Sequence, residues 1–450
     1  MALPPWTVDL LRRGVSDLAR QATDPETAQA LKDQASKLVE ELPRVAREKV
    51  DALLKQAETS AAPWRDAWMG TANVRPPQSL INASGNLLHA LGSGVAVDPS
   101  VLASAAPYLT GDCVIPRDQR ITQPTEKILS EACGVELQAM VVSSFDIGLS
   151  LLGQMGRRGS RVLVPRCCTQ WDGSEGSACL ADHLHSTTRG TIREFGSASG
   201  ATTADLLNVI GSSLASEPGG EGRSRRCHTI VRLAKACCRI APADRRELGV
   251  ADVVVMPTAR WMGIESGAMG NVVTELKQGA DAVLLGGGVM TGTPALGVWV
   301  GRTEWMQSLL SDGRASLAEA PAAMSAMVNA AVALARDGGL PVDRLMAASE
   351  ENLQDRAERL ATQLNGVDGV TSTRITQEPA RRFGGNDTLP SRQVLLTTNT
   401  TSPSVLAERL RSGDTCLLAE PSDDGIALDL RWITPDQQSR IAQRLATAIH

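Results

Sequence analysis

From about residue 77 onward, short apolar runs alternate with stretches of helical periodicity, and this alternation limits the chain to few fold classes. The apolar runs that are typical of buried strands lie at 140–142, 161–164, 253–255, 282–285 and 298–300. Helical stretches separate them at 123–133, 203–215 and 271–278. Parallel strands need a crossover connection that is usually a helix, so the alternation predicts a large α/β domain with a mostly parallel sheet.

Patterns on either side of this domain predict two smaller ones. Residues 1–76 carry apolar positions at three-to-four spacing with charges between them, which predicts a helical N-terminal domain. The large domain spans 77–335 and ends with a helix at about 320–336. Residues 336–450 begin with a long helix at 343–365 and continue as a small α+β domain. Its strands are expected at 367–375, 392–398, 414–419 and 425–431, and its helices at 403–411 and 435–448.

The charge balance and the hydropathy exclude some classes of protein. The chain has 45 basic and 50 acidic residues, which give a formal net charge of -5. A uniformly basic nucleic-acid binder is therefore excluded, and DNA is not an expected partner. No stretch approaches the roughly 18 uninterrupted apolar residues of a membrane span. The N-terminus lacks a signal-peptide pattern, so we expect a soluble, cytoplasmic protein that does not enter the membrane.

The nine cysteines and five histidines form no recognisable metal signature. Cys167-Cys168 and Cys237-Cys238 are adjacent pairs without the C-x-x-C spacing of zinc sites, so we expect free thiols in a reducing compartment. His183 and His185 have the spacing that places two side chains on one face of a strand. Because no third ligand lies nearby in the sequence, we interpret them as surface histidines and predict no metal site.

Three local motifs, spaced across the chain, carry a family resemblance. Residues 79–89 read Ser-Leu-Ile-Asn-Ala-Ser-Gly-Asn-Leu-Leu-His. Residues 279–301 end in Thr-Pro-Ala-Leu-Gly-Val-Trp-Val-Gly, and residues 426–431 read Ile-Ala-Leu-Asp-Leu-Arg. In this order the motifs resemble the opening, the cofactor-lysine segment and the closing segment of the bacterial selenocysteine synthases, the L-seryl-tRNA(Sec) selenium transferases.

The resemblance implies a fold, a cofactor and partners. The fold is that of the fold-type-I pyridoxal phosphate (PLP) enzymes. In the family, PLP is bound to a lysine as an aldimine, an acidic group pairs with the pyridine nitrogen, and a helix N-terminus holds the phosphate. The family converts serine esterified to tRNA into selenocysteine with selenophosphate. Its N-terminal domain binds tRNA, and it forms symmetric homo-oligomers, so both are expected here by resemblance.

The lysine that the family requires has no counterpart at its expected position. In the ungapped match, the family's Ser-Gly-Asp-Lys falls on Gly286-Gly287-Gly288-Val289, and valine forms no Schiff base. The chain has only seven lysines, four of them before residue 56. Lys277 lies twelve residues upstream on an expected helix and is interpreted as solvent-facing. Lys235 follows a candidate strand and is the other lysine that we consider for the site.

The acidic partner of the pyridine nitrogen also has no match. The family carries it just after the strand that corresponds to 253–255, where this chain has Pro257. Asp252 is expected before that strand and Glu265 well after it, and neither matches the family position. Arg260 lies in the same segment, and an arginine near the pyridine nitrogen opposes its protonation.

Other residues match the expected pocket by position. Ser143 and Ser144 follow a strand and open a helix, which suits a phosphate or, equally, an N-cap. Arg166 and Gly173 match an arginine and a glycine of the family after the next strand, and Gly287 and Gly288 allow close backbone approach or simply a turn. The residues expected to bind the cofactor are Ser143, Ser144, Arg166, Gly173, Gly287 and Gly288. Those expected to meet substrate are His89, Arg117 and Arg120.

Three interpretations of function follow from these residues. The first is a divergent, PLP-dependent L-seryl-tRNA(Sec) selenium transferase that takes its lysine from elsewhere or holds PLP non-covalently. The second is a pseudoenzyme of the same fold that binds RNA or a protein partner, with Trp171 and Trp261 filling the vacated space. The third is a PLP-free enzyme that uses Arg166 and Arg260 to bind an anionic small molecule.

Overall fold

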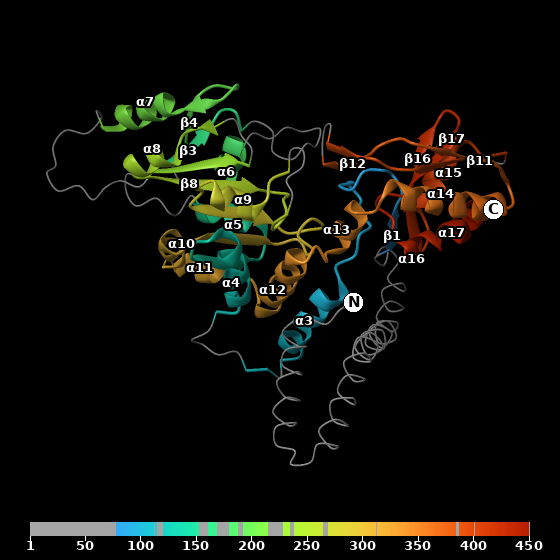
Figure 1. Ribbon diagram of the computed structural model, residues 1–450, viewed down its shortest axis with the longest axis horizontal. Coiled ribbons are helices and arrows are strands. Elements are labelled where there is room, and N and C mark those ends of the chain that lie inside the picture. Colours follow the sequence, from blue (N-terminus) through green and yellow to red (C-terminus); the bar gives the residue numbers. More distant parts are fainter. Residues whose placement is uncertain are drawn as a thin grey trace, which may run out of the picture. The chain divides into compact units, whose positions relative to one another are not determined.

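The computed structural model describes most of the chain after residue 77 (Figure 1). The described ranges are 78–111, 113–114, 120–152, 161–168, 180–187, 192–214, 228–234, 238–263, 269–311, 313–383, 387–399 and 401–449. The chain divides into two compact units, 1–77 and 78–450. The helical domain expected at 1–76 lies outside the described residues. The large α/β domain expected after it is present.

A seven-stranded sheet forms the centre of this α/β domain. Its strand order is β2 (Leu137–Val142), β10 (Gly297–Arg302), β9 (Ala282–Gly286), β8 (Val250–Met256), β6 (His228–Leu233), β3 (Val162–Pro165) and β4 (Ile192–Phe195). Strand β10 runs antiparallel to both neighbours, and the remaining pairs are parallel. The prediction of a mostly parallel sheet is confirmed. The five expected strands correspond to β2, β3, β8, β9 and β10, although β3 begins one residue after the expected start at 161.

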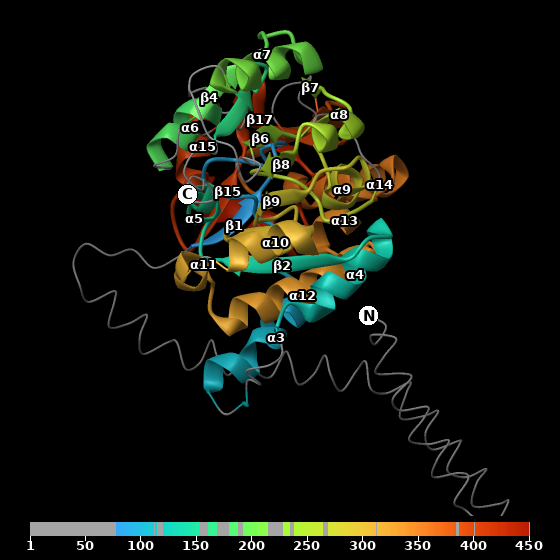
Figure 2. The ribbon, with the colours of Figure 1, turned by 90° about the vertical axis from the view of Figure 1, so that its left-hand side faces the viewer.

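Helices cover both faces of the sheet, which explains why its strands are continuously apolar. Val254 of β8 points to the face covered by α3 (Pro99–Thr110), α4 (Gln123–Cys133), α9 (Val272–Lys277) and α12 (Ala322–Arg336). Val253 and Val255 point to the face covered by α5 (Phe145–Leu152), α6 (Leu180–Thr187), α10 (Thr303–Leu310) and α11 (Gly313–Ala318). Figure 2 shows α4 and α12 beside β2. The shorter elements of this domain are β5 (Ala201–Thr202), β7 (Cys238–Arg239), α7 (Thr203–Leu214) and α8 (Pro242–Glu247).

The C-terminal part is built around a four-stranded antiparallel sheet. Its order is β11 (Val370–Thr376), β14 (Gln393–Thr398), β17 (Gly425–Asp429) and β16 (Glu420–Ser422). Helices α15 (Pro403–Arg411), α16 (Pro435–Gln438) and α17 (Ile441–Ile449) accompany it, and β12 (Ala380–Phe383) pairs with β13 (Asp387–Leu389). The strands and helices expected for a small α+β part are therefore present, within the single compact unit 78–450. The β12–β13 hairpin was not expected, and the helix expected at 435–448 is interrupted after Gln438.

The long helix expected at 343–365 is wrong, because it is two helices. Helix α13 (Pro341–Met346) ends, and α14 (Glu350–Asn365) begins after Ser349, whose hydroxyl accepts a hydrogen bond from the Asn352 amide at 3.1 Å. The guanidinium of Arg431 donates to the carbonyls of Leu345 at 3.2 Å and Ala348 at 2.8 Å. A distant arginine thus satisfies the carbonyls that the helix break leaves open.

The first and last motifs of the resemblance lie in contact. Strand β1 (Ser79–Asn82) pairs in parallel with β15 (Thr415–Leu418). The Asp429 amide donates to the Ala83 carbonyl at 2.9 Å, and the indole of Trp432 donates to the Gly85 carbonyl at 3.2 Å. Gly85 has a positive φ of 76°, which favours glycine. These two motifs therefore join the N-terminal strand to the C-terminal part.

A buried ion network lies between the sheet and its helices. Asp252 is fully buried and accepts from Arg232 at 3.0 Å and from Arg245 at 2.5 Å, and Arg232 also pairs with Glu275 at 3.0 Å. The expectation that Asp252 precedes its strand is wrong, because it lies inside β8. Burial opposes the charge of Arg232, but its carboxylate neighbours outweigh this effect and raise its pKa.

Among the described residues, no helix combines the length and apolarity that crossing a membrane requires. No group of three or more His, Cys, Asp or Glu side chains in the same ranges is arranged to hold a metal ion.

Removing one partner of the ion network should destabilise the fold strongly. Asp252→Asn leaves the guanidinium groups of Arg232 and Arg245 buried with Glu275 as their remaining carboxylate in the network, so we expect a loss of about 3–5 kcal/mol in the free energy of unfolding. Urea unfolding of the full chain measures this. As a control, Asp337→Asn breaks an exposed pair with Arg336, which should cost less than about 1 kcal/mol. Equal losses in the two variants would contradict this account.

Asp429 should make stability depend on pH. It is 1 % exposed, and burial raises its pKa from 3.8 to about 6, although the Arg431 amide, Ser391 and Gln393 donate to it. The folded chain therefore holds this proton more tightly than the unfolded chain. Between about pH 4 and pH 6 the Asp429 contribution to stability should fall by about 3 kcal/mol as pH rises.

The pH dependence is measured as the difference between the unfolding free energies of wild type and Asp429→Asn at several pH values. That difference should change steadily between pH 4 and 6 and stay level above pH 7. Asp424→Asn, which removes an exposed carboxylate from the β16–β17 turn, is the control for charge alone. A constant difference across the whole range would show that Asp429 does not titrate there.

Candidate functional site

Several residues named for the expected site follow strands at the same edge of the central sheet. Ser143 follows β2, Arg166 follows β3, Pro257 follows β8 and Gly287 follows β9. These are the carboxyl ends of mutually parallel strands, where open α/β sheets bind ligands. The side chains at this edge have the following contacts.

The glycines after β9 are needed for packing. A Cβ atom on Gly286 would lie 2.1 Å from the Pro257 carbonyl oxygen, and one on Gly287 would lie 2.3 Å from the Pro294 carbonyl oxygen. Either distance is a severe clash with backbone. Gly288 differs, because it has a φ of 147° and its Cβ position faces open space. Of the two glycines expected to meet a cofactor, Gly288 alone has free space on that side.

The loop after Gly287 folds onto itself and carries Val289. The Thr291 hydroxyl accepts from the Gly288 amide at 2.9 Å and lies 2.8 Å from the Thr293 hydroxyl, and both threonines are buried. Val289 is partly buried and packs against the hydrophobic core beneath this loop. The position of the family's lysine is therefore part of the apolar packing of this chain.

The described lysines do not lie at this edge. Lys277 is exposed and ends α9, which precedes β9 along the chain. The connection places Lys277 near the start of β9, whereas Val289 follows its end, and five strand residues span about 17 Å. Lys127 is exposed on α4. Lys235 lies outside the described residues.

The turn after β8 is bonded to neighbouring segments. Arg260 pairs with Asp343 of α13 at 2.5 Å, and the fully buried Trp261 donates its indole N–H to the Thr291 carbonyl at 2.9 Å. Burial raises the pKa of Asp343, and the nearby Arg260 guanidinium opposes that rise. Pro257 lies against Gly286. Glu265 is outside the described residues. Within the described part of this turn, the side chain that pairs with Asp343 is Arg260, and the position expected for the family's acid holds Pro257.

The helix after β2 begins with a serine cap. Ser144 Oγ accepts from the Ile147 amide at 3.2 Å, so this serine caps α5, one of the two roles expected for it. Ser143 is exposed. The first turn also contains Asp146, whose carboxylate lies 3.0 Å from His183 Nε2. A carboxylate in the first turn competes with a phosphate for the positive end of the helix.

The strand-type spacing of the histidine pair is wrong, because His183 and His185 lie on helix α6. In a helix, residues two apart point in different directions, so the two rings do not share a face. His183 faces Asp146 from the next helix, and His185 is exposed.

The remaining candidates have partners within the protein. Arg166 is exposed and lies 3.5 Å from Glu194, and Arg120 pairs with Glu126 at 2.8 Å. His89 accepts from the Leu91 amide at 3.1 Å, so its ring stabilises a local turn. Gly173, Trp171 and Arg117 lie outside the described residues. The structure thus brings Arg166 to the sheet edge but places Arg120 and His89 in local contacts.

A buried thiol lies near the same edge. Cys168 Sγ accepts from the Leu233 amide at 3.4 Å, and burial raises its pKa to about 12. Burial likewise raises the pKa of Cys238 to about 11. Thiols with such pKa values are almost entirely protonated near neutral pH and are poor nucleophiles. These cysteines therefore offer the site no nucleophile.

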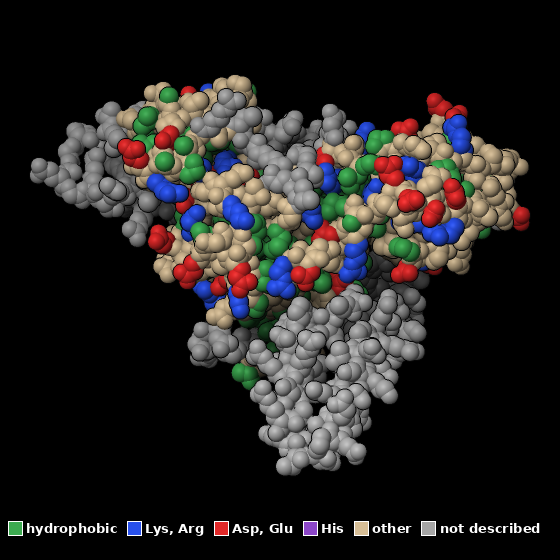
Figure 3. Space-filling view, viewed as in Figure 1, with side chains coloured by type: hydrophobic (Ala, Val, Ile, Leu, Met, Phe, Trp, Pro, Cys, Tyr) green, Lys and Arg blue, Asp and Glu red, His purple; other side chains and the backbone are tan. Residues whose placement is uncertain are grey.

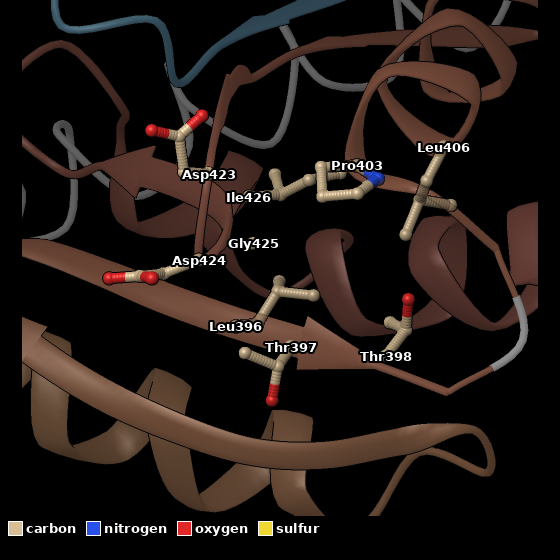
Figure 4. Close-up of a pocket in the computed structure, with 9 residues that line it drawn as sticks. All are labelled: Leu396, Thr397, Thr398, Pro403, Leu406, Asp423, Asp424, Gly425 and Ile426. Atoms are coloured by element: carbon tan, nitrogen blue, oxygen red, sulfur yellow. The ribbon is translucent and has the colours of Figure 1, made fainter.

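A separate cavity of about 260 Å³ lies in the C-terminal part (Figure 4). Leu396, Leu406 and Ile426 line it together with Pro403. The carboxylates of Asp423 and Asp424, on the adjoining turn, point away from these apolar side chains. This cavity therefore offers apolar contacts, and it shares no residue with the candidate site.

The residues at the sheet edge do not fit the cofactor that the resemblance implies. Val289 supplies no amine, and Pro257 supplies no acid for a pyridine nitrogen. Ser144 already caps α5, and the nearby Asp146 carboxylate disfavours binding of a phosphate at the start of that helix. Asp343 and Trp261 give the edge its main contacts. The sequence could not indicate a role for Asp343, because its partner Arg260 lies 83 residues away along the chain. Trp261 could be identified as a site candidate, because it directly follows Arg260 in the sequence.

Comparisons with known proteins agree with the fold. The L-seryl-tRNA selenium transferase family model matches residues 248–434. The L-seryl-tRNA(Sec) selenium transferase of Moorella thermoacetica is 25% identical over 413 residues, covering 84% of this chain and 83% of that protein. The enzyme of the same name from Solidesulfovibrio magneticus is 24% identical over 408 residues, with the same coverage of both chains.

A solved structure of D-glucosaminate-6-phosphate ammonia-lyase is similar in fold, with a TM-score of 0.55 at 16% identity, covering 83% of this chain and 96% of that one. The order of strands in the central sheet and the small C-terminal sheet agree with this similarity in fold. The chain resembles, at low identity, the L-seryl-tRNA(Sec) selenium transferases, the bacterial selenocysteine synthases, and has the fold of the fold-type-I PLP enzymes.

Proposed function

We propose that the chain is a selenocysteine synthase-like pseudoenzyme, which keeps the fold of the family as a binding scaffold and does not carry out its PLP chemistry. The observation that carries this proposal is Val289. It stands at the position of the family's lysine and packs against the hydrophobic core. A saturated hydrocarbon side chain supplies neither a nucleophilic amine nor an acid–base group.

The environment of Val289 supports the same proposal. The turn after β8 has Pro257 where the family has an acid, and its Arg260 is paired with Asp343. Two separate requirements of the chemistry therefore lack their side chains. Fold-level similarity does not carry an activity, which depends on the residues of the site.

The partner that we propose for this scaffold is RNA, bound through the N-terminal domain. The support is the family resemblance and the eleven basic residues of segment 1–76 that lie among acidic ones. On the face shown in Figure 3, basic and acidic side chains of the described part are interspersed, so this face offers no single-sign RNA surface. We also propose that the chain forms homo-oligomers and works in the cytoplasm, again by resemblance.

A second candidate is PLP-dependent selenium transfer with a lysine other than residue 289. The observation that favours it is the extent of the similarity, which covers 84% of this chain. Lys235 is the lysine to examine, because it follows β6 closely in the sequence. A PLP-free enzyme acting on an anion has less support, because Arg166 and Arg260 both already face carboxylates.

The proposal is tested by searching for a covalent lysine–PLP adduct. The full-length chain is incubated with an equimolar amount of PLP, reduced with borohydride and mapped by mass spectrometry. We expect no stoichiometric pyridoxyl lysine and no visible absorption band from the wild type. We also expect no conversion of seryl-tRNA in the presence of selenophosphate.

Lys235→Ala and Lys277→Ala are the matched controls for this experiment. Trace labelling that is spread over exposed lysines and lost at Lys277 alone would be non-specific. A stoichiometric adduct in the wild type that maps to Lys235 and disappears in Lys235→Ala would contradict the pseudoenzyme proposal and support the second candidate.

A further inference from the structure

The turns that follow β8 and β9 are bonded to each other and to α13. Gly286 allows the Pro257 backbone to approach, and Trp261 donates to the Thr291 carbonyl at 2.9 Å. Arg260 then joins the same turn to Asp343 at 2.5 Å. By the family resemblance, these two turns are where the cofactor's lysine and acidic partner are expected.

The polar groups of the two turns hydrogen-bond within the protein. The Thr291 hydroxyl is bonded to the Gly288 amide and lies beside the Thr293 hydroxyl, which donates to the Pro294 carbonyl at 3.1 Å. The Arg260 guanidinium is engaged by Asp343, whose side chain is 6% exposed. A ligand that enters here must therefore displace existing contacts, and each displaced buried group has to find a new partner.

We infer that this edge of the sheet is closed by its own contacts, with the Arg260–Asp343 ion pair as the principal closing contact, and binds no PLP, either covalently or non-covalently. The inference rests on the proposed function and extends it from the missing lysine to the whole cofactor site. PLP carries a pyridine nitrogen, a phenolate oxygen, an aldehyde and a phosphate, all of which lose water on binding and need polar partners. Among the described polar side chains of the two turns, those of Arg260, Trp261, Thr291 and Thr293 already make internal contacts.

The phosphate end of the site is consistent with this inference. Ser144 already caps α5, and Asp146 places a carboxylate in the first turn of that helix. A phosphate bound there would lie close to this carboxylate and would be repelled by it. Restoring a lysine alone would therefore not restore the site, so Val289→Lys should gain no more PLP binding than the wild type.

The experiment measures equilibrium binding of PLP without a reducing agent. Ultrafiltration with micromolar PLP and the full-length chain gives bound and free cofactor directly. We expect no saturable binding by the wild type or by Val289→Lys. Arg260→Ala/Asp343→Ala removes the ion pair without leaving a lone buried charge. In this variant, PLP binding should become saturable, with an affinity at least about tenfold higher than the detection limit that the wild type sets.

The matched control is Arg392→Ala/Glu350→Ala, which removes a 3.0 Å ion pair between the start of α14 and the segment before β14, outside both turns. It should bind no PLP. Because two alanine substitutions can prevent folding, Arg260→Gln/Asp343→Asn is prepared as well, and thermal unfolding identifies the folded variants. The uncharged pair keeps polar side chains at both positions and should show a gain in the same direction.

The outcomes separate this inference from the proposed function. Saturable, non-covalent PLP binding by the wild type, without a borohydride-stable adduct, would overturn the inference and leave the pseudoenzyme proposal standing. A specific lysine adduct would overturn both. If the folded Arg260 and Asp343 variants gained no binding, or if the control pair gained as much, the ion pair would not be what closes the edge, and the inference would fail.

Discussion

The absence of a Cβ atom at Gly286 and Gly287 is the constraint on which the candidate site depends. With these two glycines, the end of β9 lies directly against the carbonyls of Pro257 and Pro294. This close approach brings Trp261 within hydrogen-bonding distance of Thr291 and aligns the turn after β8 beside the loop that carries Val289. A side chain at residue 286 would push the two turns apart, and one at residue 287 would distort the loop that contains Pro294. A glycine run that suggests room for a ligand is here what allows protein to pack against protein.

The motifs that resemble the selenium transferases form contacts that stabilise the fold. The first and last motifs are joined by the Asp429–Ala83 hydrogen bond, and the adjacent Trp432 donates to the Gly85 carbonyl. The middle motif forms β9 and β10. These contacts hold the N-terminal strand, the central sheet and the C-terminal part together, and they contain no reacting group. A chain can therefore resemble a family over most of its length while a valine that packs against the core stands where the family's lysine is expected.

Much of the fold could be predicted from the sequence, because the spacing of apolar residues that marks helices and strands is set by residues close together in the sequence. The strands of the central sheet were recognisable because burial on both faces makes them continuously apolar. The break after Met346 was not, because its open carbonyls are bound by Arg431, more than 80 residues away. The same limit applies to the site. The sequence alone shows a valine, not a lysine, at residue 289. The pairing of Arg260 with Asp343 and the position of Asp252 inside β8 depend on tertiary contacts and could not be predicted.

The acids near β8 show why one substitution would not recreate the family's chemistry. Asp252 is committed to Arg232 and Arg245 within the sheet, and Asp343 is committed to Arg260. Withdrawing either acid to serve a pyridine nitrogen would leave a guanidinium partly or fully buried without its partner, which costs several kcal/mol, on the order of 3–5. A lysine at residue 289 would add a cation to an edge whose described acids are already paired. Restoring the chemistry thus requires three changes together: a lysine, a new acid, and the loss of the ion pair that holds Arg260. Any one of these changes alone would leave an unpaired charge at the present edge.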